Sequence, residues 1–288
     1  MTAHTPSYAF PAASPANPTR FLDRSQGRIA YDVAGSGPLV VMVPGLGDLR
    51  SEYRFLVPQL VAAGYRAVTM DIRGHGESST DWPDHASAAL GSDVVALIDH
   101  LGGGPATVIG TSMGAAAVAW AAAEAPGKIS GVVLVGPFVR DIAPRSRLAG
   151  LVQKLVIRTA FAGPWAEAAW GAYYASLYPT RKPDDFAAYR AALVANLREP
   201  GRMDATRAML NASKADVAAR LPEVAAPTLV IMGTRDPDFP DPAEEATTVA
   251  RMLRGSVRMI DGAGHYPHAE MPDVTGTAII DFLRRTAG

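Results

Sequence analysis

The chain has 288 residues, of which 48% are hydrophobic and 19% are charged, so it holds enough apolar material for a large core and is not expected to be disordered. Its 27 Lys and Arg residues balance 28 Asp and Glu residues, which gives no electrostatic reason to expect a nucleic-acid or membrane-surface partner; a small-molecule substrate is the better expectation. The lack of cysteine excludes disulfides, thiolate metal sites and a cysteine nucleophile, and it fits a reducing, cytoplasmic location.

The N-terminal stretch, residues 1–20, is predicted to be a flexible tail. Up to about Pro18 it is rich in Pro, Ala, Ser and Thr, and it has neither the basic start nor the continuous apolar run of a signal peptide. The long apolar window at residues 106–125 is interrupted by turn residues such as Gly110 and Gly114. We therefore interpret that window as a buried strand, a tight turn and a buried helix, and not as a membrane span.

From about Arg28 to Arg140, short apolar runs alternate with amphipathic or Ala-rich segments, which is typical of βα units around a parallel sheet. The runs are β-branched and bounded by Gly or Pro, and we predict strands at Leu39–Val43, Arg66–Met70, Ala106–Ile109 and Val132–Val135. The segments Tyr53–Ala63 and Ala88–Leu101 have helical spacing and supply the crossovers between the strands.

From about Asp141 to Leu221 the strand signal gives way to Ala-rich, helical sequence. Strands return at Thr228–Met232 and Ser256–Ile260, and a final helix is predicted at Val274–Arg285. We predict one α/β core formed by residues 21–140 and 222–288. Residues 141–221 would form a helical cap over the carboxyl ends of the strands, where open α/β sheets bind their ligands.

The motif Gly110-Thr111-Ser112-Met113-Gly114 carries the strongest chemical signal in the chain. It follows a predicted strand and precedes an Ala-rich helix, the context of a G-x-S-x-G nucleophile elbow. Small residues on either side of Ser112 let the backbone turn sharply and present the hydroxyl above the sheet. The alternative is a plain turn residue beside a buried helix. We predict Ser112 as a nucleophile.

A serine hydroxyl needs a base, which is normally a histidine. His265 lies in a Gly-rich loop after the last predicted strand, at a strand end that faces the expected ligand crevice, and is our candidate. The alternative for His265 is a solvated surface group. His268 competes weakly, and His75 is predicted to be structural.

The carboxylate that orients this base is predicted to be Asp236. It comes soon after the strand Thr228–Met232, and the following Pro237 restricts its backbone; Asp238 is the next candidate. The chain order Ser, Asp, His is the one expected when such a constellation is built on a parallel sheet.

Two backbone amides are predicted to stabilise a developing oxyanion. The N–H of Met113 begins a helix, where the helix dipole also favours negative charge. The N–H of Leu46 lies in the glycine-rich turn that follows the strand Leu39–Val43. The alternative for this turn is an ordinary strand-to-helix connection.

Together these blocks resemble the α/β-hydrolase superfamily over about residues 28–286. The blocks are residues 43–47 (Val-Pro-Gly-Leu-Gly), 71–78 (Asp-Ile-Arg-Gly-His-Gly-Glu-Ser), 110–114 (Gly-Thr-Ser-Met-Gly), 233–236 (Gly-Thr-Arg-Asp) and 264–265 (Gly-His). The resemblance implies an α/β-hydrolase fold with an eight-stranded, mostly parallel sheet, flanking helices and an inserted helical cap. It also implies an oxyanion hole from the amides at Leu46 and Met113. Pro44 departs from the His that many members carry there.

The expected activity is that of a serine hydrolase, carboxylesterase-like, that cleaves a small carboxylic ester or lactone through an acyl-enzyme and needs no metal or cofactor. The resemblance also covers carbon–carbon bond hydrolases and cofactor-free haloperoxidases or perhydrolases with the same triad, and a ligand-binding protein with little turnover is a third hypothesis. Cap aromatic residues would either line an apolar acyl pocket or pack the cap: Trp165, Trp170, Tyr173 and Tyr174.

Overall fold

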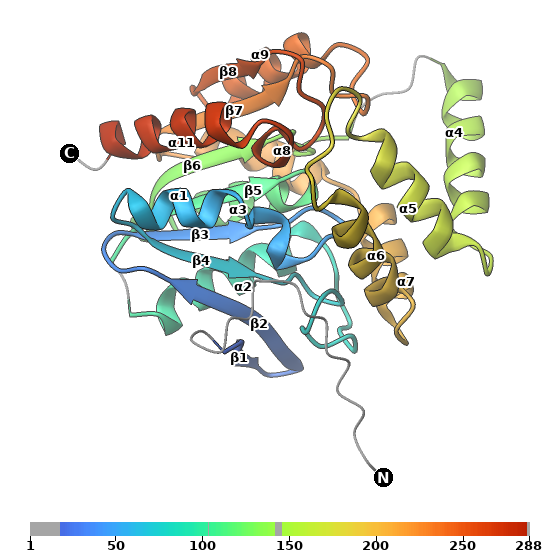
Figure 1. Cartoon of the computed structure of the whole chain (residues 1–288), viewed down its shortest axis with the longest axis horizontal. Helices are drawn as coiled ribbons and strands as arrows, with labels where there is room; N and C mark the ends of the chain where they lie inside the picture. Colours follow the sequence, from blue (N-terminus) through green and yellow to red (C-terminus); the bar gives the residue numbers. More distant parts are fainter. Residues whose placement is uncertain (1–17, 103, 142–145, 287–288) are drawn as a thin grey trace.

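The computed structural model of the chain describes residues 18–102, 104–141 and 146–286. At its centre is an eight-stranded sheet in the order β1-β2-β4-β3-β5-β6-β7-β8, with helices on both faces (Figure 1). The strands are β1 Arg20–Arg24, β2 Gly27–Ala34, β3 Leu39–Val43, β4 Arg66–Met70, β5 Ala106–Thr111, β6 Ile129–Val135, β7 Thr228–Gly233 and β8 Ser256–Ile260. All neighbours from β4 to β8 are parallel, whereas β2 runs antiparallel to both β1 and β4.

Helices cover the two faces of the sheet. One face carries α1 Leu56–Ala62 and α11 Pro272–Thr286, and the other carries α2 Ser87–His100, α3 Met113–Glu124 and α9 Pro242–Met252. In β3, Val40 and Met42 belong to the core on the first face, whereas Val41 and Val43 belong to the core on the second. Because both faces are buried, the central strands read in the sequence as continuous apolar runs.

The edge hairpin β1–β2 is not among the strands predicted from the sequence. In β1 only Leu22 is buried, and in β2 only residues 29–31 are buried, so the hairpin is less apolar than the central strands. Most of the predicted N-terminal tail, residues 1–17, lies outside the described residues. Its last residue, Arg20, begins β1, and the hydroxyl of Thr19 donates to Glu77 (3.0 Å).

The chain between β6 and β7 forms helices. They are α4 Arg147–Ala160, α5 Ala166–Ser176, α6 Phe186–Leu197, α7 Arg202–Asn211 and α8 Ala215–Arg220. Helix α6 packs against α5 and α7, beside the carboxyl ends of the strands, while α8 packs against α2 and α3 on the core (Figure 1). Within the described residues, no helix combines the length and the apolar composition that crossing a bilayer requires.

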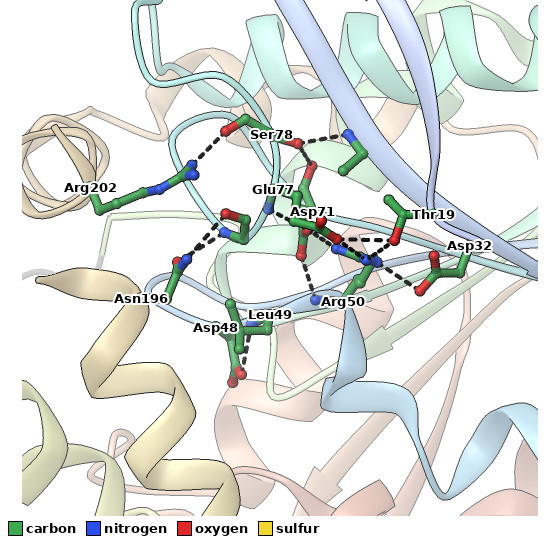
Figure 2. Close-up of polar contacts among 12 residues, drawn as sticks. Thr19, Asp32, Asp48, Leu49, Arg50, Asp71, Glu77, Ser78, Asn196 and Arg202 are labelled. Atoms are coloured by element: carbon green, nitrogen blue, oxygen red, sulfur yellow. Dashed lines mark hydrogen bonds and ion pairs between the residues drawn. The ribbon is translucent and has the colours of Figure 1, made fainter. Parts of the chain in front are cut away.

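A buried polar network fixes the loops around the strand ends (Figure 2). The guanidinium of Arg50, just after the turn that follows β3, contacts Asp71, Glu77 and Asp32, the last at 2.7 Å. The amide of Arg50 also donates to Asp71 Oδ1 (2.7 Å). Because a buried charge without a partner costs several kcal/mol, roughly 3–5 by mutagenesis, the network holds the turn in one position.

Two side chains from the inserted helices join this network. Asn196 of α6 accepts a hydrogen bond from the amide of Gly76 (3.0 Å) and donates one to its carbonyl (3.1 Å), and Arg202 of α7 donates to the carbonyl of Ser78 (Figure 2). Residues far apart in the sequence thus tie the inserted helices to the loop after β4. The loops and helices around the strand ends form one connected structure.

Candidate active site

The predicted site residues meet at the carboxyl edge of the sheet. Ser112 follows β5, Leu46 follows β3, and His265 follows β8. With Met113, these residues line one cavity of about 720 Å³. Asp236 follows β7 and lies behind His265, with 2% of its surface exposed. Parallel strands end at the same edge, which explains why residues spread over the sequence are brought together here.

Ser112 occupies a sharp turn between β5 and α3. Its backbone has φ 54° and ψ −118°, a conformation that non-glycine residues rarely adopt. Its neighbours must be small: a Cβ on Gly110 would lie 2.4 Å from the carbonyl oxygen of Gly114, and a Cβ on Gly114 would lie 2.3 Å from that of Val43. The structure therefore has the strained geometry that the motif predicted for an elbow.

His265 and Asp236 form a buried hydrogen-bonded pair. Nδ1 of His265 lies 2.7 Å from Oδ2 of Asp236, and each residue is at most 2% exposed. The amide of His265 donates to the carbonyl of Leu177 (3.0 Å), just after α5. A carboxylate that accepts from Nδ1–H leaves Nε2 free to accept a proton, so this arrangement suits a general base.

A second carboxylate, Asp238, stands close to this pair. Its Oδ2 lies 3.8 Å from Nδ1 of His265 and accepts a hydrogen bond from the hydroxyl of Tyr173 (2.7 Å). Burial lowers the pKa of His265, but the negative charges of Asp236 and Asp238 outweigh burial and raise that pKa to about 9. Burial also raises the pKa of the Asp238 carboxyl, which the charge of His265 partly offsets.

Among the described residues, these three side chains are also the group that could hold a metal ion. One ligand-type atom from each of Asp236, Asp238 and His265 lies within 4.8 Å of the others. A metal on Nδ1 of His265 would displace the hydrogen bond to Asp236, so metal binding and the base geometry are mutually exclusive at this nitrogen.

The turn after β3 holds its amides in fixed directions. The amide of Gly45 donates to Oε2 of Glu52 (2.8 Å), and the amide of Gly47 donates to Nε2 of His75 (3.0 Å). Among the described residues, none accepts a hydrogen bond from the amide of Leu46. Met113 is the first residue of α3, so its N–H has no partner within the helix. Both predicted oxyanion donors are available.

Three residues next to this turn were either not predicted as site residues from the sequence or were given a low rank there. Glu52 and His268 are each 1% exposed, and Oε1 of Glu52 lies 2.9 Å from Nε2 of His268, at ion-pair distance but without hydrogen-bond geometry. Asp48 is fully buried, and burial together with the charge of Glu52 raises the pKa of Asp48 well above its usual range. The available signal was two acidic residues, Asp48 and Glu52, within seven positions of Gly45 and directly after a buried strand.

The cavity wall is mainly aromatic and apolar. Phe161, Trp170 and Tyr173 line it, whereas Tyr174 is buried among other aromatic rings and Trp165 is 53% exposed. Of the four cap aromatic residues named in the sequence, two therefore line the pocket. Nε1 of Trp170 is buried and has no hydrogen-bond partner in the described part of the chain, and the indole packs against Gly47 in the turn after β3.

A family model described as the alpha/beta hydrolase family matches residues 40–277, which is most of the chain. The chain belongs to the α/β-hydrolase family. This result confirms the resemblance inferred from the motifs, and the eight-stranded, mostly parallel sheet confirms the predicted fold.

Relatives of this α/β hydrolase are named for several different activities. It is 30% identical to a 2-hydroxy-6-oxo-6-phenylhexa-2,4-dienoate hydrolase of Comamonas testosteroni, over 91% of this chain and 93% of that one. It is 29% identical to the magnesium-chelatase 30 kDa subunit of Rhodobacter capsulatus, over 86% of this chain and 87% of that one. A putative non-heme bromoperoxidase of Mycobacterium tuberculosis is 37% identical over 108 residues, and this chain spans 41% of that protein.

Solved structures share the fold of this α/β hydrolase. A bromoperoxidase from Bacillus anthracis has a TM-score of 0.77 at 24% identity, and a thermophilic esterase from Thermogutta terrifontis has 0.74 at 23%. Each match covers 93% of this chain and 99% of the other chain. At these identities the likeness shows the fold alone.

We expect His75→Ala in this α/β hydrolase to act mainly on stability. Burial lowers the pKa of His75 to about 4, so the ring is neutral at pH 7, and its Nε2 accepts from Gly47. The substitution leaves the Gly47 amide without this acceptor, and we expect the free energy of unfolding to fall by about 1–3 kcal/mol in urea denaturation. The exposed Arg251 on α9 is the control, and Arg251→Ala should change the free energy of unfolding by about 0.5 kcal/mol or less. Equal effects of the two substitutions would contradict this role for His75.

Proposed function

We propose that this α/β hydrolase cleaves a small carboxylic ester or lactone through an acyl-enzyme on Ser112. The observation that carries the proposal is the buried pair of His265 and Asp236 (2.7 Å), whose imidazole lines the same cavity as the strained Ser112. Hydrolase family membership agrees with this chemistry. The mainly apolar wall of the cavity suits an apolar acyl group.

In the first half of the reaction, Oγ of Ser112 attacks the acyl carbon while Nε2 of His265 takes the hydroxyl proton. The negative charge that develops on the carbonyl oxygen is stabilised by the amides of Leu46 and Met113. The carbon–oxygen bond then breaks, and the leaving alcohol takes the proton from His265. Asp236 stabilises the imidazolium throughout.

In the second half, water repeats the attack on the acyl-enzyme. His265 takes a proton from the water, the same amides hold the second oxyanion, and Ser112 leaves with the proton from His265, which releases the carboxylic acid. The Leu46 donor is held in place because its neighbours Gly45 and Gly47 donate to Glu52 and His75, and the Met113 donor is held as the first residue of α3. The site therefore needs little rearrangement as charge develops.

Carbon–carbon bond hydrolysis is the second candidate function. It is favoured by the 30% identity to the 2-hydroxy-6-oxo-6-phenylhexa-2,4-dienoate hydrolase over most of both chains. Peroxide-dependent chemistry has weaker support, because the bromoperoxidase relative from Mycobacterium tuberculosis matches over 37% of this chain. Activity that strictly requires peroxide and a carboxylic acid would favour that alternative over ester hydrolysis.

The deciding experiment combines active-site labelling with an ester series. Intact-mass analysis after incubation with a fluorophosphonate should show a single adduct, and p-nitrophenyl esters of increasing acyl length should reveal turnover and the length that the cavity accepts. Labelling without turnover of any ester would move the proposal to the carbon–carbon bond alternative. The absence of both labelling and turnover would favour a ligand-binding protein.

We expect kcat/KM to rise with pH, because only the neutral form of His265 can accept a proton. Its pKa of about 9 places the midpoint of the rise well above the usual value of 6.5. In Asp238→Asn one of the charges that raise this pKa is lost, so the midpoint should move to lower pH. The test is the pH profile for an uncharged ester in both proteins. An unchanged or higher midpoint in Asp238→Asn would show that Asp238 does not act on His265.

A further inference from the structure

The exposed apolar side chains of the described residues are concentrated on one helix. Large hydrophobic residues that are exposed are Leu148, Leu151, Val152, Leu155, Val156, Trp165, Val257 and Val274. The first five lie on α4, and Trp165 ends the short connection from α4 to α5. Leu151 and Leu155 leave 67% and 65% of their surface exposed, as much as a charged surface residue would.

The five residues on α4 form a single stripe. Their positions follow the i, i+3, i+4, i+7, i+8 spacing that a globular protein normally turns toward its core. Here the core-facing side of α4 is a different one, because Ile157 and Ala160 line the cavity of the candidate site. Helix α4 stands at the periphery of the molecule, apart from the sheet (Figure 1). The apolar stripe therefore faces solvent.

The sequence in and around α4 carries charge of one sign. Between Asp141 and Glu167 the sequence contains the basic residues Arg145, Arg147, Lys154 and Arg158 and no acidic residue. Within α4, the spacing of positions 147, 154 and 158 places them along one side of the helix, roughly 100° from the centre of the apolar stripe. Helices with an apolar stripe and a basic flank bind anionic membrane surfaces.

We propose that α4 docks this protein on an anionic lipid surface, with its apolar stripe in the interface. Trp165 is placed as an interfacial anchor, since exposed tryptophan favours the boundary between lipid and water. A second copy of the chain is a poorer occupant, because a two-fold contact through this stripe would bring two sets of basic residues together. The near-neutral charge of the whole chain predicted no membrane-surface partner, but it conceals this local excess of basic residues.

Docking through α4 would bring the catalytic cavity to the lipid surface. Val156 belongs both to the exposed stripe and to the cavity lining, so the stripe continues into the wall of the cavity that contains Ser112. An apolar ester dissolved in the lipid could then reach Ser112 without crossing water. This consequence rests on the proposed function, whereas the docking itself does not.

The test is vesicle co-sedimentation of the full chain. Wild type should bind vesicles of phosphatidylcholine with about 30% phosphatidylglycerol more tightly than vesicles of phosphatidylcholine alone, and raising salt from about 0.1 to about 0.5 M should weaken the binding. The double variant Leu151→Glu/Leu155→Glu should bind at least about tenfold more weakly. Val274→Glu, at a 49% exposed valine on α11, is the matched control and should bind like wild type.

Fluorophosphonate labelling of Ser112 without vesicles shows that each variant is folded and tests the proposed function separately. Failure of wild type to bind the anionic vesicles, or equal binding by the double variant, would overturn the docking proposal. A dimer in solution that the double variant dissociates, together with no vesicle binding, would assign the stripe to a second copy of the chain.

Discussion

Ser112→Ala is expected to lower kcat for p-nitrophenyl esters by about 10⁶-fold, the largest effect of any single substitution in this protein. The substitution removes the atom that forms the acyl-enzyme, and the remaining rate would come from the oxyanion donors and from substrate binding. The fluorophosphonate adduct should disappear in the same variant. Ser176, on α5 in the inserted helices, is exposed and provides the control; Ser176→Ala should keep both the adduct and the turnover.

The strained backbone at Ser112 gives this prediction a second readout. At φ 54° an alanine keeps the strain and a glycine relieves it, so Ser112→Gly should be more stable than Ser112→Ala by about 1–3 kcal/mol in urea denaturation. Both variants should be equally inactive. Substantial ester turnover in either variant would place the nucleophile elsewhere, and a glycine variant that is no more stable would mean that the turn is not strained.

Three strands of the parallel part of the sheet could be predicted to the residue, because local sequence and tertiary environment agree there. The structure has β3, β4 and β8 at the predicted bounds, and each begins or ends beside turn residues such as Pro38 and Gly255. The hairpin β1–β2 lies at the edge of the sheet, where one-sided burial leaves a weaker pattern. The resemblance to the family implied eight strands, but the residues alone indicated six.

The candidate site could be predicted where topology decides the arrangement. Ser112, Asp236 and His265 each follow a parallel strand, so the fold alone brings them to one edge. The contacts that hold the turn after β3 could not be predicted in this way. The bond from Gly47 to His75 joins residues 28 positions apart, and the network from Arg50 reaches Asp32 and Glu77 through the packing of separate loops.

The electrostatics of the site could not be predicted from the sequence either. Three aspartates follow β7, and the sequence ranked Asp236 above Asp238 by its distance from the strand. The structure places both near Nδ1 of His265, at 2.7 and 3.8 Å. The raised pKa of His265 depends on this double proximity, which outweighs the opposing effect of burial, and a linear motif contains neither.

Asp236→Asn is expected to lower kcat by about 10⁴-fold, the second largest effect. The side-chain amide introduced at this position would donate to Nδ1 of His265 and hold its proton on Nε2, so that the imidazole faces Ser112 with a donor in place of an acceptor. Asp238→Asn is the matched control, because it removes a carboxylate from the same loop that is 1.1 Å farther from the same nitrogen (3.8 against 2.7 Å). It should retain most of the turnover and shift only the pH profile.

Asp236→Ala distinguishes the roles of Asp236 and Asp238 more sharply than Asp236→Asn does. Without a side-chain amide to enforce the wrong tautomer, Asp238 can move toward Nδ1 and take over part of the orienting role, so this variant should be more active than Asp236→Asn. Adding Asp238→Asn to Asp236→Ala should remove the recovered activity, and this non-additivity would measure the coupling between the two groups. If Asp238→Asn alone caused the greater loss, the assignment of the two aspartates would be reversed, and Asp238 would be the carboxylate that orients the base.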